Sequence, residues 1–229
     1  MSELIGVIGE SGTGKSTACR TLDSKKTAIV NCIGKPLPFR GWKKNYTTFS
    51  KENMDGNYYS TDNTASIIKF MKHISDNRPE ITNLVIDDWQ YTMSNEFMRR
   101  SNEKGFDKFT DIGKNAWSTL NAGKSLRDDL KVFIITHSET IPGEFGARPI
   151  IKIKTIGKLL DDKINPAGLF TILLFTDVHS KDNGEVEYRL VTNNDGNYPA
   201  KSPMEMFEKT YISNDLGVVG TTVDEYYNG

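Results

Sequence analysis

Hydrophobic and polar positions alternate along the chain in blocks that predict strands and helices in turn. Short runs of consecutive apolar residues are typical of buried strands, whereas apolar residues spaced three or four apart are typical of helices. The predicted strands cover residues 3–8, 27–33, 81–87, 131–137, 169–178 and 186–192. The predicted helices cover about residues 17–22, 63–74, 90–103, 109–120, 155–164 and 202–209. This order predicts an α/β protein whose mostly parallel sheet has helices on both faces.

The last third of the chain has a different pattern. Its two predicted strands are joined through Asp182-Asn183-Gly184, a sequence that favours a tight hairpin turn. Ser202-Pro203-Met204-Glu205 has the form of a capping box with proline at the first helical position, and it is the signal for the last predicted helix. No repeat or linker divides the 229 residues. We therefore expect one domain over 1–229, with a parallel core over about 1–140 and an antiparallel β extension over about 147–210.

Composition narrows the classes of protein that the chain could belong to. With 29 basic and 30 acidic residues the chain is close to neutral, whereas a tight duplex-DNA binder is usually more basic. Contact with nucleic acid would therefore need local patches of basic residues, or many subunits that bind together. We expect no membrane partner, since no run of 18 apolar residues occurs, and no signal peptide, since the first strand begins at once. Cys19 and Cys32 lack metal-site spacing, which favours buried thiols in a reducing compartment.

Residues 9–16 read Gly-Glu-Ser-Gly-Thr-Gly-Lys-Ser, a full match to the phosphate-binding loop G-x-x-x-x-G-K-[ST]. The loop follows a predicted strand and precedes a predicted helix, which is the context that the motif requires. Its glycines let backbone N–H groups turn toward phosphate oxygens, and the helix N-terminus adds the positive end of its dipole. The alternative, a glycine-rich turn that binds nothing, fits this match poorly.

The loop therefore predicts ATP and Mg²⁺ as ligands. Lys15 should reach the β- and γ-phosphates, and the Ser16 hydroxyl should ligate Mg²⁺. The residues expected to contact the nucleotide are Gly9, Glu10, Ser11, Gly12, Thr13, Gly14, Lys15, Ser16 and Thr17.

The strand that ends in Leu84-Val-Ile-Asp87-Asp88 has the form of a Walker B element. Asp87 would hold Mg²⁺ directly or through a water molecule. Asp88 has two interpretations: it orients or deprotonates the water that attacks the γ-phosphate, or it caps the following helix. The strand over 131–137 ends in Thr136 and His137, and either residue could sense the γ-phosphate. A histidine at a strand end is also often only structural.

Two stretches combine basic residues with features of binding surfaces. Phe39, Arg40, Trp42, Lys43 and Lys44 mix large aromatic rings with cations, as single-strand-binding surfaces do. The same loop could instead cover the nucleotide base or pack against the protein. Lys154 and Lys158 follow the sensor strand, and as a solvated edge they would merely discourage aggregation of strands.

Taken in order, the phosphate loop, Val85-Ile-Asp-Asp-Trp89, Ile135-Thr-His-Ser-Glu139 and Lys154-Thr-Ile-Gly-Lys158 resemble bacteriophage RecA-like P-loop ATPases. Some members of this group are Sak-type single-strand annealing recombinases. The resemblance covers most of the chain. It implies a RecA-like P-loop NTPase fold, a homo-oligomeric ring or filament with ATP between subunits, single-stranded DNA as partner and the cytoplasm of an infected bacterium as location. A single-strand-binding protein could be a further partner, and Lys154 and Lys158 would complete the site of a neighbouring subunit.

One departure from this group affects the expected activity. RecA-like ATPases usually carry a catalytic glutamate at the end of the second core strand, where this chain has Asn31-Cys32-Ile33. Either Asp88 has taken that role or hydrolysis is slow. We expect a DNA-stimulated ATPase of recombination or replication. The alternatives are a P-loop kinase, which usually has an arginine-rich lid that the eight scattered arginines do not form, and an ATP-dependent motor or assembly factor that binds no nucleic acid.

Overall fold

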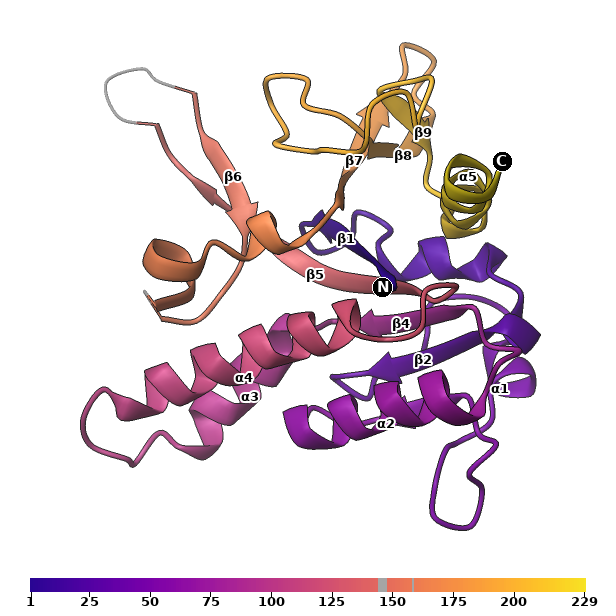
Figure 1. The fold of residues 1–229 in the computed structure, drawn as a ribbon. Coiled ribbons are helices and arrows are strands. Elements are labelled where there is room, and N and C mark those ends of the chain that lie inside the picture. Colours follow the sequence, from indigo (N-terminus) through magenta and orange to yellow (C-terminus); the bar gives the residue numbers. More distant parts are fainter. Residues whose placement is uncertain (144–147, 158) are drawn as a thin grey trace.

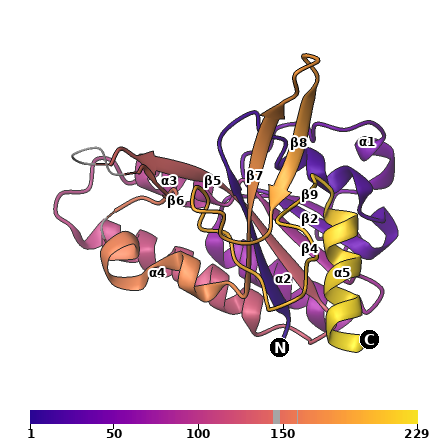
Figure 2. The same cartoon turned by 90° about the horizontal axis from the view of Figure 1, so that it is seen from above.

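The computed structural model describes residues 1–143, 148–157 and 159–229, and in these residues nine strands form a sheet between two layers of helices (Figures 1 and 2). The sheet order is β3-β2-β4-β5-β1-β7-β8-β9, and β6 pairs with β5. The strands are β1 (Glu3–Gly9), β2 (Thr27–Asn31), β3 (Tyr58–Ser60), β4 (Asn83–Asp87), β5 (Lys131–Ile141), β6 (Ile150–Ile153), β7 (Ile172–Ser180), β8 (Val186–Val191) and β9 (Tyr211–Ser213).

The helices are unevenly distributed over the two faces of the sheet. The described helical segments are η1 (Ser16–Thr21), η2 (Ser24–Lys26), α1 (Trp42–Asn45), α2 (Thr64–Asn77), α3 (Gln90–Arg99), α4 (Asp107–Lys124), η4 (Leu159–Ile164), η5 (Pro166–Leu169) and α5 (Leu216–Asn228). Helices α2, α3 and α4 cover one face, and η1 and α5 lie on the other (Figure 1).

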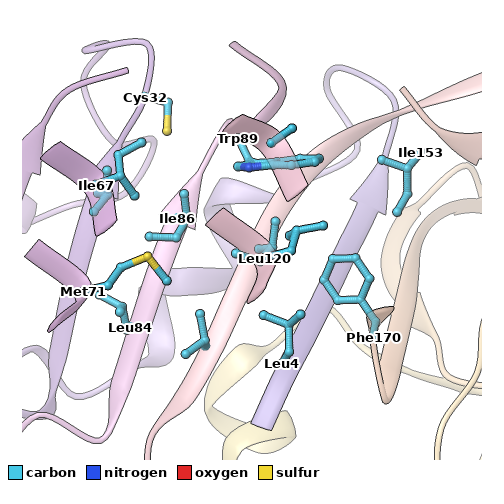
Figure 3. Close-up of a cluster of buried hydrophobic side chains, with 14 of the residues drawn as sticks. Leu4, Cys32, Ile67, Met71, Leu84, Ile86, Trp89, Leu120, Ile153 and Phe170 are labelled. Atoms are coloured by element: carbon cyan, nitrogen blue, oxygen red, sulfur yellow. The ribbon is translucent and has the colours of Figure 1, made fainter. Parts of the chain in front are cut away.

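Strand β1 shows how the sequence builds this three-layer arrangement. Leu4 and Ile8 belong to the core shared with α2, α3 and α4, whereas Ile5 and Val7 belong to the core shared with η1 and α5. Because side chains of a strand point alternately to opposite faces, an unbroken apolar run serves two cores at once. Figure 3 shows the first core, where Leu120 lies between Leu4 and the fully buried Trp89.

The central strands are parallel, and β5 lies between β1 and β4. Gly9 at the end of β1 pairs with His137 of β5, and Asn31 at the end of β2 pairs with Asp87 of β4. The carboxyl ends of the four strands therefore meet at one edge, where the phosphate loop begins. This order confirms the mostly parallel α/β fold expected from the alternating pattern.

The predicted antiparallel extension is also confirmed. Strand β7 pairs parallel with β1, and β8 and β9 follow it antiparallel, so the β7–β8 hairpin projects from the sheet (Figure 2). A second antiparallel pair forms where β5 continues beyond the core and meets β6. No helix of the described residues is long and apolar enough to cross a membrane.

Three local predictions differ from the structure. Residues 202–209 form turns instead of a helix, and Glu205 has a left-handed φ of 64°. The left-handed Glu205 interrupts a right-handed helix at this point, and Met206 and Phe207 both pack into the core shared with η1 and α5. The segment after the phosphate loop is a 3₁₀-helix of six residues. The helix expected over 155–164 is limited, within the described residues, to the π-helical turn η4.

The C-terminal helix α5 is the longest of the elements that the sequence analysis did not predict, alongside α1, β3 and β9. Its signal was present: Asp215 is the N-cap, and its side chain accepts a hydrogen bond from the Val218 N–H, while Leu216, Val219 and Val223 form a buried stripe. Both cysteines are buried and free, as expected, and burial raises the pKa of each thiol.

Candidate nucleotide-binding site

The phosphate loop is a tight turn between β1 and η1. Gly12 and Gly14 have φ of 83° and 86°, a left-handed conformation that side chains other than glycine's rarely adopt. A Cβ on Gly9 would lie 1.7 Å from Thr176 Oγ1, so this position needs glycine because β7 packs directly against it. The Thr13 hydroxyl bonds to the Glu10 carbonyl at 2.7 Å and to Thr176 Oγ1 at 2.6 Å. The extension therefore holds the loop in place.

Lys15 lies inside this turn. Its Nζ donates a hydrogen bond to the Glu10 carbonyl at 2.6 Å, and the residue is almost fully buried. Burial lowers the pKa of Lys15 to about 8, although the carboxylates of Asp88 and Asp87 oppose the shift. A buried ammonium beside turned backbone N–H groups is suited to bind phosphate oxygens.

Ser16 and Asp87 meet as the motifs predict. Ser16 Oγ donates to Asp87 Oδ1 at 2.8 Å, and Asp87 Oδ2 is buried with no hydrogen-bond partner among the described residues. Burial and the neighbouring Asp88 raise the pKa of Asp87 to about 6. A hydroxyl and a carboxylate with a free buried oxygen are hard oxygen ligands, so this pair fits Mg²⁺.

Asp88 connects three elements at the sheet edge. Its Oδ2 lies 2.6 Å from Lys35 Nζ, and its Oδ1 lies 3.6 Å from His137 Nε2. Burial alone would raise the pKa of Asp88, but the neighbouring His137 and Lys35 side chains outweigh burial and lower it. The carboxylate does not cap α3 within the described residues, since the N-cap position is Trp89 and no side-chain cap bond forms there. The charged form of Asp88 thus faces the site.

The backbone around Asp88 is fixed by its neighbours. Asp88 has a left-handed φ of 60°, an uncommon conformation for a residue other than glycine. The Trp89 side chain is fully buried (Figure 3), and the backbone N–H of Trp89 donates to the Ile135 carbonyl of β5 at 2.9 Å. Packing of this large ring therefore compensates for the unfavourable backbone at Asp88, as is common where strain positions a functional group.

The two sensor candidates occupy different places. Thr136 is buried, and its hydroxyl donates to Gln90 Oε1 at 3.0 Å, away from the carboxylate of Asp88. His137 is half-buried, faces Asp88 and lines the cavity beside the phosphate loop. Of the two, His137 is placed to meet a nucleotide.

A cavity of about 1020 Å³ joins these groups. Phosphate-loop residues line it together with Lys35, Asp88 and His137. The extension contributes a further wall, with Tyr188 of β8 and Ser213 and Asn214 at the end of β9. Asn214 Nδ2 donates to the Gly14 carbonyl at 2.9 Å, and Arg20 Nη1 donates to the Asn214 carbonyl at 2.9 Å. The wall is thus attached to the loop and to η1.

Sequence reasoning missed Lys35 and this wall. Lys35 stands four residues beyond Asn31, the end of β2, and its place at the carboxyl end of a strand was the available signal. No sequence pattern indicated Tyr188 or Asn214, because they reach the loop only through the pairing of β8 with β7 and β9.

Only the start of the basic and aromatic stretch, at Lys35, Pro36 and Pro38, lines the cavity, and its five candidate DNA-binding residues do not. Trp42 is half-buried and packs on Tyr58 with ring centroids 5.5 Å apart, and Phe39 meets Tyr46 edge-on at 6.4 Å. Arg40, Lys43 and Lys44 are exposed. The rings therefore have protein partners, while the three cations face solvent.

The two predicted trans-acting lysines are less closely tied to the site. Lys154 is exposed, and its backbone N–H donates to the His137 carbonyl at 2.8 Å, but its side chain is not among the residues that line the cavity. Lys158 lies outside the described residues.

The similarities of this chain to known proteins lie in structure. No family model matches the chain, and no curated protein matches its sequence. Among solved structures, the genome packaging NTPase B204 from Sulfolobus turreted icosahedral virus 2, in complex with ATP-gammaS, is similar with a TM-score of 0.41 and 10% identity. The match covers 83% of this chain and 92% of that chain.

The chain's own features define its fold class. The phosphate loop follows the first strand, the paired aspartates follow β4, and β5 lies between these two strands in a mostly parallel sheet. An antiparallel hairpin extends the sheet beyond β7. This is the mixed α/β fold of a P-loop NTPase with a C-terminal β extension.

Proposed function

We propose that the protein binds ATP with Mg²⁺ and hydrolyses it. The observation that carries this proposal is the convergence of Lys15, Ser16 and Asp88 on one cavity, with the buried Asp87 hydrogen-bonded to Ser16 behind it. Each group has the chemistry that its position requires: a cation for phosphate, oxygen ligands for the metal and a charged carboxylate for water.

The proposed reaction uses few groups of the protein. A water oxygen forms a bond to the γ-phosphorus, and the bond from that phosphorus to the β–γ bridging oxygen breaks to leave ADP and inorganic phosphate. Asp88 orients the water and accepts its proton, while His137 holds the carboxylate. Lys15 offsets negative charge on the β- and γ-phosphates. When bound between Ser16 and Asp87, Mg²⁺ would neutralise phosphate charge and fix the geometry of the phosphate chain.

The decisive experiment compares wild type with Lys15→Ala and Asp88→Asn by calorimetry and by phosphate release. Lys15→Ala should lose tight ATP binding and keep the fold, because truncating a buried charged partner of phosphate costs about 2–5 kcal/mol. Asp88→Asn should bind ATP and hydrolyse it slowly. Unchanged ATP affinity in Lys15→Ala would refute the phosphate-loop assignment. A wild-type rate of hydrolysis in Asp88→Asn would mean that another group is the catalytic base.

We further propose that the protein is a RecA-like phage enzyme that acts on single-stranded DNA as a ring or filament in the cytoplasm of the infected host, with a single-strand-binding protein as a candidate partner. The resemblance of the sequence blocks and the exposed Arg40, Lys43 and Lys44 support this. ATP turnover with and without single-stranded DNA tests it, and a screen of acceptor nucleotides tests the kinase alternative. If DNA does not change the rate of ATP hydrolysis and no acceptor is phosphorylated, a motor or assembly factor would be favoured.

The DNA surface has its own test. Replacing Lys43 and Lys44 should flatten the salt dependence of DNA binding by about one unit for each lost phosphate contact. Trp42→Ala should weaken binding by about 1–3 kcal/mol if a base stacks on the ring. Because Trp42 also packs on Tyr58, thermal unfolding of the variant must be measured beside its affinity. If none of the three changes alters DNA affinity, this stretch is not part of the DNA-binding surface.

A further inference from the structure

The ammonium group of Lys35 stands between a buried carboxylate and the nucleotide cavity. Its Nζ lies 2.6 Å from Asp88 Oδ2, and its side chain is 48% exposed whereas that of Asp88 is 1% exposed. Lys35 lines the same cavity as Lys15 and Ser16. It is therefore a cation that can turn toward a ligand without any change in the sheet.

The backbone that carries Lys35 is held rigidly next to the metal-binding strand. Asn31 is fully buried at the end of β2, where it pairs in register with Asp87. Its Nδ2 donates to the Lys35 carbonyl at 2.6 Å, and its Oδ1 accepts from the Gly34 N–H at 2.8 Å. Gly34 has a φ of 73°, so the chain turns sharply here and returns toward the cavity. The asparagine at the strand end thus positions a lysine.

Two cations converge on this part of the cavity. Lys15 and Lys35 both line the cavity, and so does Asp88, whose carboxylate pairs with Lys35. Like charges that line one cavity create a positive potential, and an anion bound near both relieves their repulsion. Lys15 belongs to the phosphate loop, so the anion that both lysines could share is the end of the phosphate chain.

We propose that Lys35 is a catalytic residue that contacts the γ-phosphate from within the same subunit, exchanging its partner Asp88 for that phosphate when ATP binds. This inference rests on the proposed ATP-binding function. A terminal phosphate carries about −1.5 to −2 charges, more than the single charge of a carboxylate, and a lysine can swing between the two because its ammonium has three donors on a flexible stem. The exchange leaves Asp88 with His137 and with free acceptor capacity for the attacking water.

The alternative is that Lys35 only neutralises the buried Asp88. The two roles differ in their effect on nucleotide discrimination. A residue that contacts the γ-phosphate contributes to the binding of ATP analogues and not to that of ADP, whereas a residue that merely supports Asp88 affects both nucleotides alike.

Calorimetry with the non-hydrolysable analogue AMP-PNP and with ADP separates these roles in Lys35→Met, which keeps the aliphatic stem. AMP-PNP affinity should fall about tenfold, as for loss of one charge-assisted contact, while ADP affinity changes less than about twofold. Lys35→Arg should restore part of the preference for AMP-PNP. Lys51→Ala removes an exposed lysine from the same β2–β3 connection outside the cavity and should leave the preference unchanged.

A double-mutant cycle with Asp88→Asn gives the stricter test. Asp88→Asn should bind AMP-PNP more tightly than wild type, because the competing partner of Lys35 is gone. Adding Lys35→Met to Asp88→Asn should still lower AMP-PNP affinity about tenfold. If Lys35→Met has no effect in the Asp88→Asn background, or if the single variant keeps the full preference for AMP-PNP over ADP, the proposed contact is wrong and ATP binding stands. Absence of any nucleotide binding by wild type would instead overturn the proposed function, and this inference with it.

Asn31→Ala tests the positioning role. The variant should lose part of the AMP-PNP preference, in the same direction as Lys35→Met, and its thermal unfolding shows whether β2 is intact. A folded Asn31→Ala that keeps the whole preference would show that Lys35 finds the phosphate without this support.

Discussion

Gly14 is in close contact with two side chains from the C-terminal extension. A Cβ at this position would lie 2.5 Å from Asn214 Nδ2 and 3.2 Å from Tyr188 Cδ1, whereas a Cβ on Gly12 would meet nothing within 4 Å. Both glycines have left-handed φ angles, so the two positions share the backbone requirement and differ in the space around them. This difference separates the phosphate loop's own conformation from its attachment to the extension.

Replacing the two glycines by alanine should therefore have unequal effects. Each variant should lose about 1–2 kcal/mol of folding free energy from the left-handed backbone. Gly14→Ala should lose more and should also weaken ATP binding further than Gly12→Ala, because the Asn214–Gly14 hydrogen bond has to break. Chemical denaturation and calorimetry on the pair measure this. Equal losses in the two variants would mean that the extension does not brace the loop.

The shifted pKa values of Asp87 and Lys15 predict a pH window for binding. Mg²⁺ needs ionised Asp87, whose pKa is raised to about 6, and phosphate needs protonated Lys15, whose pKa is lowered to about 8. Affinity for ATP with Mg²⁺ should therefore be greatest between about pH 6 and pH 8 and fall on either side. Since a terminal phosphate itself titrates near pH 6, Asp87→Asn is the control for the acidic side. If affinity falls below pH 6 in the same way in wild type and in Asp87→Asn, protonation of Asp87 is not the cause of the fall.

The same shifts act on stability with opposite signs. A carboxyl with a raised pKa binds its proton more tightly in the folded state, so the contribution of Asp87 is present below about pH 4 and is lost as the pH rises through 6. An amine with a lowered pKa holds its proton less tightly in the folded state, so Lys15 makes the free energy of unfolding rise between about pH 8 and 10.5.

At this scale, local sequence motifs predicted only part of the candidate site. Lys15, Ser16 and Asp87 meet because their motifs fix both residue type and place in the chain. Lys35 and Asn214 have no motif, since their positions depend on a turn held by Asn31 and on strand pairing in the extension. Contacts of that kind follow from tertiary packing, which a single sequence does not encode in a local pattern.

Among the elements, η1 and α5 depend on one another. The helix after the phosphate loop is a short 3₁₀-helix, a form with poorer hydrogen bonding than an α-helix. Helix α5 packs beside it, and Asp215 Oδ1 accepts both from the Val218 N–H and from Thr21 Oγ1. The carboxylate thus caps α5 and links it to the end of η1.

Asp215→Ala should lower the free energy of unfolding by more than the loss of an N-cap alone would. Loss of an aspartate N-cap costs about 0.5–2 kcal/mol, and the bond to Thr21 adds to this. Asp215→Asn keeps an acceptor oxygen and should retain most of the stability. Urea denaturation of wild type and the two variants measures these losses. Nucleotide affinity then shows whether η1, which follows the phosphate loop, is also disturbed. A cost no larger in Asp215→Ala than in Asp215→Asn would show that the cap contributes little.

Element prediction succeeded where period and length were clear, as in α4, whose apolar residues recur at helical spacing. It failed over 202–209, where a capping-box pattern had no apolar stripe behind it, and over α5, where the stripe was present but went unnoticed. Capping residues mark a helix start only when the following residues can bury one face.

For the whole molecule, the proposed oligomer would place each nucleotide site next to a neighbouring subunit. That neighbour would supply a further cation, and Lys154 and Lys158 are the candidates that the sequence resemblance supplies. Lysine lacks the bidentate fork of arginine, so its effect should fall below the 10³–10⁵-fold in rate that arginine fingers give.

Mixing two inactive variants can test this arrangement. One subunit carries Lys154→Ala and Lys158→Ala, and the other carries Lys15→Ala. If the lysines act on a neighbour, mixed assemblies should recover ATPase activity, because some interfaces join an intact phosphate loop to intact lysines. Size measurement with ATP confirms that the variants assemble together. Co-assembly without recovery would assign the lysines to their own subunit or to DNA.

The position of β5 between β1 and β4 also has a consequence for the order in which the protein folds. The phosphate loop and the paired aspartates are complete once residue 88 has been synthesised, yet the strand that joins their two strands begins at residue 131. A nascent chain therefore holds both halves of the site before it holds the strand between them. We expect a fragment that ends after α4 to have both motifs and no binding site, so nucleotide binding reports completion of the core during synthesis.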